Sequence, residues 1–336
     1  MRALVTGAAG TNGRWIVERL LAEGFDVFAF DQGWDAQSAD GLPRHVEGFA
    51  GDVADVEGIS SCADAFAPDV IVHLAALLAA PSQRDPLRAC AVNVGGTAAV
   101  LEAARRAGTK RVVFASSVVA YSPFMGEWGH PTYRPVDESY PNDPLPHFRV
   151  YGATKRAGEQ LGIHYREEYG IEFAALRFAM ILTPGITGRH FAGTPPQAAM
   201  IESAMRGEPF HLERGGDQLA DYLYIKDLAK SVVCAATTGQ DPTGIFNIGS
   251  GQLSSMHDLA SAVRIHIPDA RITIGDGLDP LGVGPIYCRF DPTKSRDVLG
   301  FAPDFTDLVT TVGDYIEIAA TTGDNVKVTR FSRRSA

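Results

Sequence analysis

The chain has 336 residues, of which 45% are hydrophobic and 21% are charged, a composition that is ordinary for a soluble globular protein. Its formal net charge of −10 and its pI of about 5.4 argue against nonspecific binding to nucleic acid or to an anionic membrane. No apolar run approaches the length that is needed to cross a bilayer.

The N-terminus and the cysteines bear on targeting and redox state. Met1 is followed at once by a predicted core strand, so we expect no signal peptide. The four cysteines are scattered along the chain without metal-ligand spacing, so we expect no metal site and free thiols in a reducing cytoplasm.

The first half of the chain alternates short apolar runs with helical patterns. Strands are predicted over residues 2–6, 26–30, 45–50, 70–74, 111–115 and 172–177. Helices are predicted between them, over residues 12–23, 56–65, 86–107 and 146–169. Runs that are apolar on both faces and separated by helices indicate a parallel sheet that is covered on both sides. We therefore expect an α/β fold with a Rossmann-like, doubly wound parallel sheet.

Glycine and proline become frequent after Arg177, and the predicted elements become shorter. Helices are predicted over residues 197–206, 225–238, 255–264 and 307–319, and a strand over residues 244–249. We interpret this half as a smaller C-terminal lobe that binds the substrate. The predicted division is a first domain of residues 1–178, to which 222–250 return, a lobe of residues 179–221 and 251–325, and a polar tail of residues 326–336.

Three glycines, Gly7, Gly10 and Gly13, lie between the first predicted strand and the first predicted helix, where a phosphate-binding turn belongs. Gly7 permits the tight turn, Gly10 lets the backbone approach a pyrophosphate, and Gly13 lets the helix pack close to the strand. The N-terminus of the helix offers free N–H groups and a positive dipole end to the anion. A loop that only turns a corner is the alternative for an isolated match.

Asp31 ends the second predicted strand, 18 residues past Gly13. A carboxylate at this place accepts hydrogen bonds from the ribose hydroxyls of an adenosine and repels a 2′-phosphate. The neighbours Gln32, Gly33 and Trp34 offer no positive charge. The sequence therefore predicts NAD rather than NADP, against the alternative that Asp31 only starts a turn.

Tyr151 and Lys155 are four residues apart on a predicted helix and therefore share one of its faces. A free tyrosine, with a pKa of about 10, keeps its proton at neutral pH and is a poor base there, and an adjacent ammonium favours its ionised form. Ionised, Tyr151 takes the proton from a substrate alcohol while a hydride leaves the carbon. A solvated pair on an exposed helix is the alternative. The position of the pair after the fifth predicted strand favours the chemical interpretation.

Two hydroxyls, Ser116 and Ser117, end the fifth predicted strand. Ligands of parallel sheets bind beyond the carboxyl ends of the strands, so both serines are expected on the reactive side. We predict that one of them orients the substrate alcohol, and a merely polar strand end is the alternative.

Together these residues resemble the extended short-chain dehydrogenase/reductase family, which includes NAD-dependent sugar epimerases and dehydratases. The resemblance covers nearly the whole chain and includes further blocks at residues 51–53, 73–76, 93–97, 221–227 and 246–251. It implies that Ser117 rather than Ser116 is the catalytic hydroxyl, beside Tyr151 and Lys155, and that Asn93 supports the active-site helix.

The resemblance also implies the residues that bind the cofactor, NAD, and the substrate. The expected cofactor-binding residues are Gly7, Gly10, Thr11, Asn12, Gly13, Asp31, Gln32, Asp52, Val53, Leu74, Ala75, Ala76, Asn93, Ala115, Tyr151, Lys155 and Phe178. The expected substrate contacts are Leu78, Ser117, Val118, Tyr151, Met180 and Arg189.

The chain departs from the family where relatives hold the diphosphate of a UDP-sugar with an asparagine and two arginines. Met180 and Ala220 occupy two of these positions, and residues 282–288 contain no arginine. Burying a diphosphate without cationic or amide donors is costly, so the three losses argue against a nucleotide sugar. Replacement of the lost donors by other residues stays open, and the candidates are Arg189, His190 and Arg214. Residues 73–80 are similar to the family's threonine and small sugar-acid dehydrogenases.

The main functional hypothesis is an NAD-dependent oxidoreductase. It oxidises or reduces a secondary alcohol on a small polar substrate, such as a sugar, a sugar acid or a hydroxy amino acid. The alternative is a UDP-glucose/galactose-type 4-epimerase that retains its NAD. A 4,6-dehydratase is disfavoured because residues 117–119 lack the acidic pair of that branch, and a non-catalytic NAD sensor because Tyr151 and Lys155 are both present.

The expected partners are a small-molecule substrate and a second copy of the chain, with no nucleic acid and no membrane. The resemblance implies a homodimer formed through the helices at residues 86–107 and 146–169. Small residues on these helices, such as Ala98 and Ala157, suit helix-helix contact and also suit docking on the sheet. The long stretch between Ser117 and Tyr151 is expected to form a loop over the pocket, against the alternative of a surface excursion.

Overall fold

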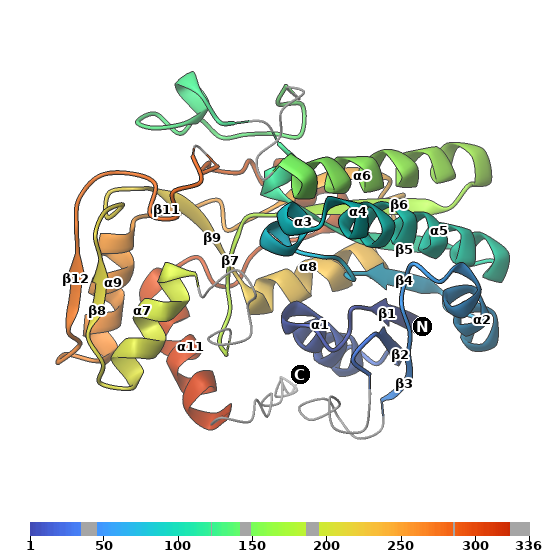
Figure 1. Ribbon diagram of the computed structural model, residues 1–336, viewed down its shortest axis with the longest axis horizontal. Helices are drawn as coiled ribbons and strands as arrows, with labels where there is room; N and C mark the ends of the chain where they lie inside the picture. The colour runs from blue at the N-terminus through green and yellow to red at the C-terminus, as the bar shows by residue number, and fades with distance from the viewer. Residues whose placement is uncertain (35–45, 122, 142–148, 186–194, 285, 323–336) are drawn as a thin grey trace.

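The protein is described here by a computed structural model of residues 1–336, with the exception of 35–45, 122, 142–148, 186–194, 285 and 323–336. Its centre is a seven-stranded sheet with the strand order β10-β6-β5-β4-β1-β2-β3 (Figure 1). Every neighbouring pair in this sheet is parallel. The strands are β1 (Arg2–Thr6), β2 (Asp26–Asp31), β3 (Glu47–Ala50), β4 (Val70–His73), β5 (Arg111–Ser117), β6 (Glu172–Phe178) and β10 (Gly244–Ile248). The predicted doubly wound α/β fold is confirmed.

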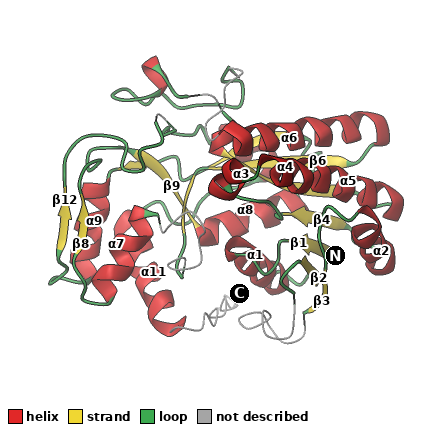
Figure 2. Cartoon of the chain, in the orientation of Figure 1, coloured by secondary structure: helices red, strands yellow, loops and turns green. Residues whose placement is uncertain are grey.

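Helices cover both faces of the sheet (Figure 2). One face packs against α1 (Thr11–Ala22) and α8 (Ile225–Thr237), and the other against α2 (Val56–Phe66), α5 (Gly96–Ala107) and α6 (Arg149–Tyr169). Along β1, Val5 belongs to the first core and Leu4 to the second, and both side chains are fully buried. This alternation explains why the strands are apolar at nearly every position.

The region predicted as one helix over residues 86–107 consists of three consecutive segments. A short helix, α4 (Pro86–Ala89), leads into a π-helical turn at Cys90–Gly95, and α5 follows. Asp85 begins this region by accepting a hydrogen bond from Arg88 N, and Gly108 ends it in a left-handed conformation with a φ of 68°. The π turn carries Asn93, and π turns of this kind often occur at functional sites.

The second half of the chain forms a lobe beside the sheet (Figure 1). Its helices are α7 (Pro196–Met205), α9 (Met256–His266) and α11 (Leu308–Thr322), whereas α10 (Thr293–Leu299) packs against β10 and α8. Its short strands are β7 (Met180–Leu182), β8 (Phe210–Leu212), β9 (Ala220–Tyr224), β11 (Leu253–Ser254) and β12 (Ile272–Ile274). The chain returns from this lobe to the main sheet, where β10 pairs with β6. The division of the chain into domains at residues 178, 222 and 250 stays our interpretation of this arrangement.

Among the described residues, none of the helices combines the length and the apolar character that a membrane span requires.

Candidate active site

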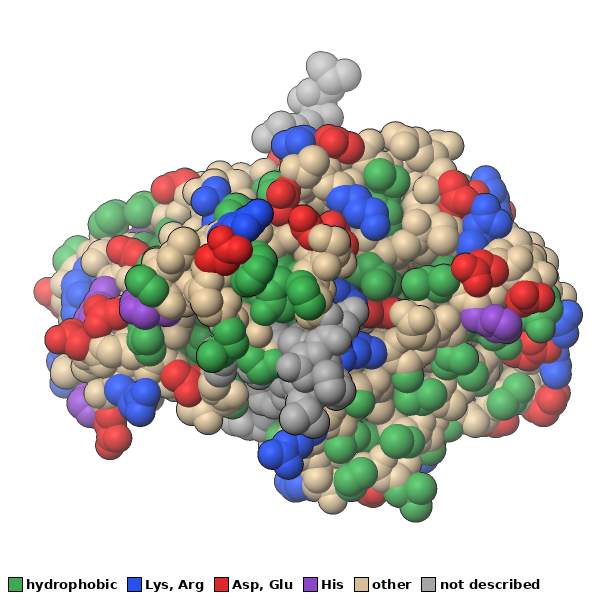
Figure 3. Space-filling view, turned by 90° about the horizontal axis from the view of Figure 1, so that it is seen from above, with side chains coloured by type: hydrophobic (Ala, Val, Ile, Leu, Met, Phe, Trp, Pro, Cys, Tyr) green, Lys and Arg blue, Asp and Glu red, His purple; other side chains and the backbone are tan. Residues whose placement is uncertain are grey.

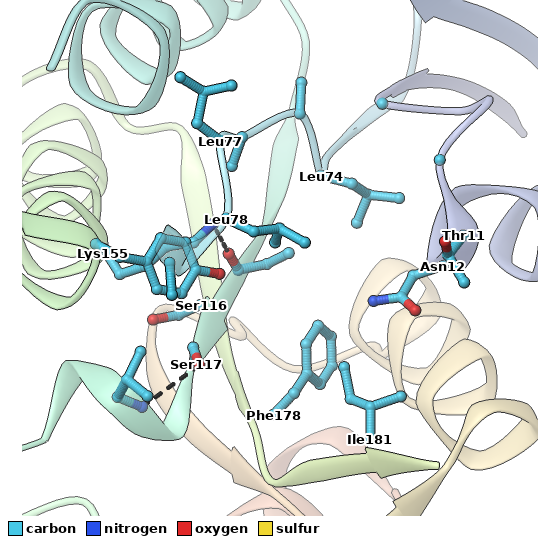
Figure 4. Close-up of a pocket in the computed structure, with 18 of the residues that line it drawn as sticks. Thr11, Asn12, Leu74, Leu77, Leu78, Ser116, Ser117, Lys155, Phe178 and Ile181 are labelled. Atoms are coloured by element: carbon cyan, nitrogen blue, oxygen red, sulfur yellow. Dashed lines mark hydrogen bonds between the residues drawn. The ribbon is translucent and has the colours of Figure 1, made fainter. Parts of the chain in front are cut away.

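A cleft of about 1120 Å³ lies at the carboxyl ends of the central strands, between the sheet and the lobe. Its sheet side consists of the glycine-rich turn, the segment after β4, the end of β5 and α6. Its lobe side includes residues of β7, the start of α7, and Leu281, Val283 and Ile286. In Figure 4, Lys155, Ser116 and Ser117 lie on one side of this cleft, and Thr11 and Asn12 of α1 lie on the opposite side. The position agrees with the rule that ligands bind beyond the carboxyl ends of parallel strands.

The glycine-rich turn is as tight as its sequence predicts. Gly7 has a φ of +73°, a left-handed conformation that favours glycine. A Cβ on Gly13 would lie 2.2 Å from Gly7 O, so only glycine permits this contact between α1 and the turn. Gly10 caps α1 and accepts a hydrogen bond from Arg14 N at 3.2 Å. The result is a narrow cradle at a helix N-terminus, a setting that suits a pyrophosphate.

Asp31 links the end of β2 to this turn. Its Oδ2 accepts a hydrogen bond from Ala9 N at 3.1 Å, and its Oδ1 accepts one from Gly33 N at 2.9 Å. These bonds fix the carboxylate at the wall of the cleft, because Asp31 and Gln32 both line it. A fixed negative charge beside the turn fits the ribose of NAD and repels the 2′-phosphate of NADP.

Tyr151 and Lys155 lie on the same face of α6, one turn apart, and both line the cleft. The Nζ atom of Lys155 lies 5.6 Å from the centre of the Tyr151 ring and 4.9 Å from that of Phe114. The same Nζ atom donates a hydrogen bond to Ala115 O at 2.6 Å, which fixes the ammonium at the end of β5. The structure therefore brings the predicted base and its helper together.

Desolvation governs the titration of both side chains. It raises the pKa of the Tyr151 phenol well above its usual range. It also lowers the pKa of Lys155 to about 8, and the carboxylate of Glu159 opposes this second shift. Burial therefore opposes the ionised form of Tyr151 that the adjacent Lys155 ammonium favours. An oxidised nicotinamide bound in the cleft would add a second positive charge and would favour that form further.

The two serines at the end of β5 have different surroundings. Ser116 Oγ donates a hydrogen bond of 2.6 Å to Glu159 Oε1, a buried carboxylate on α6. Ser117 Oγ has a weaker contact, accepting from Val119 N at 3.4 Å at the start of a 3₁₀ turn (Val118–Ala120). Ser117 thus retains its hydroxyl proton for another acceptor, which supports its assignment as the residue that orients the substrate.

Most of the predicted cofactor and substrate residues line the cleft. These are Gly7, Gly10, Thr11, Asn12, Gly13, Asp31, Gln32, Val53, Leu74, Ala75, Ala76, Leu78, Ala115, Ser117, Val118, Tyr151, Lys155, Phe178 and Met180. Their individual roles stay predictions. Arg189, the remaining expected substrate contact, lies outside the described residues, as does His190.

Two predicted residues lie behind the lining instead. Asp52 forms an ion pair of 2.5 Å with Arg88, and Arg88 rather than Asp52 lines the cleft. Asn93 is buried, where its side chain bonds the backbone N and O of Leu77 at 2.7 Å and 3.0 Å. It also donates to Thr154 Oγ1 at 3.0 Å, so it connects the segment after β4 to α6. This geometry agrees with a supporting role for Asn93 and gives it no contact with the cleft.

The sequence predicts little of the lobe side of the cleft. The described lobe residues that line it are Ala179, Met180, Ile181, Thr183, Pro195, Gln197, Leu281, Val283 and Ile286, and only Met180 was expected. None of these residues carries a positive charge. Leu281, Val283 and Ile286 come from a stretch without helical or strand periodicity, so no local pattern identifies them as cleft residues. On the face shown in Figure 3, acidic and basic side chains are interspersed.

Comparison with known proteins gives a consistent result. A model of the "NAD dependent epimerase/dehydratase family" matches residues 3–249. The chain is 32% identical over 315 residues to the UDP-glucose 4-epimerase of Mycolicibacterium smegmatis, a match that covers 90% of this chain and 94% of that protein.

Solved structures with the same fold include two bacterial epimerases. The UDP-glucose 4-epimerase of Thermotoga maritima, solved with UDP-glucose, has a TM-score of 0.80 and 25% identity, and the match covers 94% of this chain and 99% of that one. The UDP-glucose 4-epimerase of Thermus thermophilus, solved with NAD, has a TM-score of 0.76 and 27% identity over the same shares of the two chains.

Proposed function

We propose that this chain, which belongs to the NAD dependent epimerase/dehydratase family, is a nucleotide-sugar 4-epimerase that acts on a UDP-hexose of the glucose/galactose type. Family membership confirms the resemblance found in the sequence, the prediction of an enzyme and the prediction of NAD. The substrate and the reaction are our proposal. The observation that carries it is a cleft with the serine, tyrosine and lysine together, in a chain that matches a UDP-glucose 4-epimerase over 90% of its length.

This proposal reverses the order of the two functions expected from the sequence. The main expectation was a dehydrogenase of a small polar alcohol, and the epimerase was the alternative. The relatives that match nearly the whole chain favour the alternative. The main expectation rested on the three missing diphosphate donors, whose positions follow from the pattern of the family and not from contacts in this cleft.

The residues that would hold NAD fit it well. The cradle formed by Gly7, Gly10 and Gly13 is too narrow for side chains and suits a pyrophosphate. Asp31 would accept hydrogen bonds from the adenosine ribose. The fixed ammonium of Lys155 would donate to the second ribose and add positive charge near Tyr151. When bound, NAD supplies the hydride acceptor of the reaction.

The three side chains on the sheet side would handle the proton. Ser117 would donate a hydrogen bond to the 4-hydroxyl oxygen of the sugar and hold it near Tyr151. Tyr151 would remove the hydroxyl proton as the hydride leaves carbon 4, giving a 4-keto sugar. After the sugar turns over in the cleft, Tyr151 would return the proton while the hydride returns to the opposite face. The sugar therefore undergoes no net oxidation, because the proton and the hydride that it loses are both returned to it.

One observation favours a second candidate function, an NAD-dependent dehydrogenase that releases its reduced cofactor. The described lobe residues of the cleft are mostly apolar and include no cation and a single side-chain amide, that of Gln197, whereas a diphosphate needs several charged or amide donors. A small polyol, sugar acid or hydroxy amino acid would not need such donors.

A single substrate panel separates the two candidates. We expect purified protein to interconvert UDP-glucose and UDP-galactose without accumulating reduced nicotinamide, as measured by chromatography of the sugars and by nicotinamide absorbance. The proposal would be wrong if neither UDP-sugar turned over while polyols, aldonates or hydroxy amino acids produced reduced nicotinamide in proportion to substrate consumed.

A further inference from the structure

A buried ion pair lies directly behind the proposed catalytic residues. Glu159 of α6 and Arg177 of β6 are each 1% exposed, and they are joined by two hydrogen bonds. Arg177 Nε donates to Glu159 Oε1 at 2.8 Å, and Arg177 Nη2 donates to Oε2 at 2.6 Å. The guanidinium also stacks 4.1 Å from the centre of the Tyr121 ring. Removing two charges from water is costly, so a pair at this depth needs a reason beyond stability.

The contacts of Glu159 suggest that reason. The same Oε1 atom accepts the hydrogen bond from Ser116 Oγ, so one carboxylate binds both β5 and β6 to α6. Ser116 stands between Ala115, whose carbonyl holds Lys155, and Ser117, which faces the cleft. Glu159 therefore fixes the end of β5 at residues 115–117. This segment holds the Lys155 ammonium through Ala115 O and carries Ser117.

Glu159 is also the negative charge that acts on Lys155. It lies one helical turn beyond Lys155 on α6 and opposes the loss of the lysine proton. The other groups that face this ammonium are Tyr151 on α6, the Phe114 ring on β5 and His73 on β4. His73 is buried and neutral, and Arg177 on β6 is a cation that is paired with Glu159.

We propose that Glu159 is a positioning residue for the reaction. Its carboxylate ties Ser116 to α6 and thereby fixes Ser117 relative to Lys155, and its charge stabilises the Lys155 ammonium. Arg177 holds the carboxylate in place. The inference rests on the proposed roles of Ser117, Tyr151 and Lys155, and it adds a residue that never touches the substrate.

The chain offers a matched control. A second ion pair, between Arg111 and Glu172, joins the same two strands, β5 and β6, at their opposite ends. Its arginine is buried and its glutamate is partly buried, and the distance from Arg111 Nε to Glu172 Oε2 is 2.7 Å. A purely structural role for Glu159 predicts that Glu159→Gln and Glu172→Gln have similar consequences.

The experiment compares these two variants in the full-length protein with NAD. We expect Glu159→Gln to lower kcat by about tenfold with little change in KM, because Ser117 and Lys155 lose their fixed separation. We also expect the alkaline limb of the kcat profile to move to lower pH by about one unit, since the lysine loses a neighbouring negative charge. Glu172→Gln is expected to lower the melting temperature while leaving kcat and the alkaline limb unchanged.

Two further measurements keep the test decisive. The double variant Glu159→Leu/Arg177→Met removes both charges together, a replacement that buried ion pairs often tolerate, and we expect it to fold and to show the same fall in kcat. The reactivity of the Lys155 amine toward acetic anhydride, followed against pH by mass spectrometry, needs no turnover. We expect its midpoint to fall in Glu159→Gln and to stay in Glu172→Gln.

Failure of the proposed function and failure of the role of Glu159 give different results. If the wild-type protein turns over none of the substrates of the panel above, the proposed function fails, and the Lys155 titration still tests the role of Glu159. If Glu159→Gln or the folded double variant retains the wild-type kcat and pH profile, or if the Lys155 midpoint does not move, the positioning role is overturned.

Discussion

At the scale of single residues, the site combines two groups whose titration is opposed by their surroundings. Desolvation raises the pKa of Tyr151 and lowers that of Lys155 to about 8, so both resist the charged forms that the proposed chemistry uses. The sequence spacing predicts their proximity but not their burial. Burial therefore disfavours the phenolate, and bound oxidised nicotinamide would favour it. Prior binding of the cofactor would then aid proton removal.

The first prediction concerns Tyr151. Tyr151→Phe removes the proton acceptor and leaves the ring in place, so we expect turnover to fall by roughly 10²- to 10⁴-fold, the usual range for loss of a general base. NAD affinity, measured by calorimetry, is expected to stay within about twofold of the wild type, because the cradle is untouched. Unchanged turnover would remove the catalytic assignment. Lost NAD binding would mean that the variant disturbs the cleft itself.

The second prediction concerns His73, which is buried between two hydroxyls. Its Nδ1 lies 2.7 Å from Thr6 Oγ1, and its Nε2 lies 3.1 Å from Thr97 Oγ1. Desolvation, with a smaller contribution from the Lys155 charge, lowers the pKa of His73 to about 3. Because the folded state binds this proton less well than the unfolded state, stability is full above the unfolded pKa and is lost as the pH falls below it.

We expect this single group to cost about 1.5 kcal/mol of unfolding free energy between pH 6.5 and pH 5, a window set by the ordinary histidine pKa. Urea unfolding of the wild type and of His73→Gln at several pH values measures the difference. The variant is expected to be less stable at pH 7.5 and to lose less stability on acidification. Parallel pH profiles for the two proteins would contradict the assignment of His73 as a neutral buried group.

At the scale of elements, the first helix and its turn depend on the absence of one side chain. A Cβ on Gly13 would lie 2.2 Å from Gly7 O and 2.7 Å from Ala8 O, both rigid backbone atoms. We expect Gly13→Ala to destabilise the fold by about 2 kcal/mol, as overpacking does, and to weaken NAD binding at least about tenfold. Thermal unfolding and calorimetry measure the two effects.

Gly239→Ala is the matched control for this third prediction. It follows α8, and a Cβ there would meet no atom within 4 Å. We expect its stability to change by less than about 0.5 kcal/mol and its NAD affinity to be that of the wild type. If the two variants had equal stability and equal NAD affinity, the turn would tolerate a side chain, and the assignment of a narrow cradle at Gly13 would be wrong.

The elements also show how far a sequence predicts a fold. The strand over residues 2–6 was predicted to the residue, because a run that is buried on both faces has a distinct apolar pattern. The strands β7, β8 and β12 were missed, since each has only three residues and its partner lies far away in the sequence. The π turn at Cys90–Gly95 was missed as well, because its composition does not differ from that of a regular helix.

At the scale of the whole molecule, the sheet side of the cleft can be predicted from the sequence, whereas the lobe side cannot. Its sheet side comes from motifs with fixed chemistry, such as the glycine turn and the pair on α6. Its lobe side brings Met180 of β7 into one cluster with Leu281, Val283 and Ile286, an arrangement that depends on how the lobe folds. The cofactor was therefore predicted from the residues, whereas the substrate had to be inferred from relatives.

The last prediction is the homodimer through α5 and α6. Two small residues of α6 have different surroundings. Gly158 packs against the sheet, because a Cβ there would lie 2.6 Å from the Phe114 ring, whereas Ala157 is only half-buried. Leu87, at the start of the same surface, is 83% exposed. A second copy that covers this surface would remove an exposed apolar side chain from water.

We expect the wild-type protein to elute as a dimer in size-exclusion chromatography with light scattering, and Ala157→Arg to elute as a monomer. An arginine there would bring an unpaired charge into a close contact between helices, and burying such a charge costs several kcal/mol. Ala22→Arg is the control, because Ala22 is an exposed alanine at the end of α1, on the other side of the sheet. A wild-type monomer, or dimers in both variants, would place the contact elsewhere. Dissociation in Ala157→Arg alone would place it on α6, whose opposite face holds Lys155 and Glu159, and dimerisation would then brace the helix that carries the proposed base.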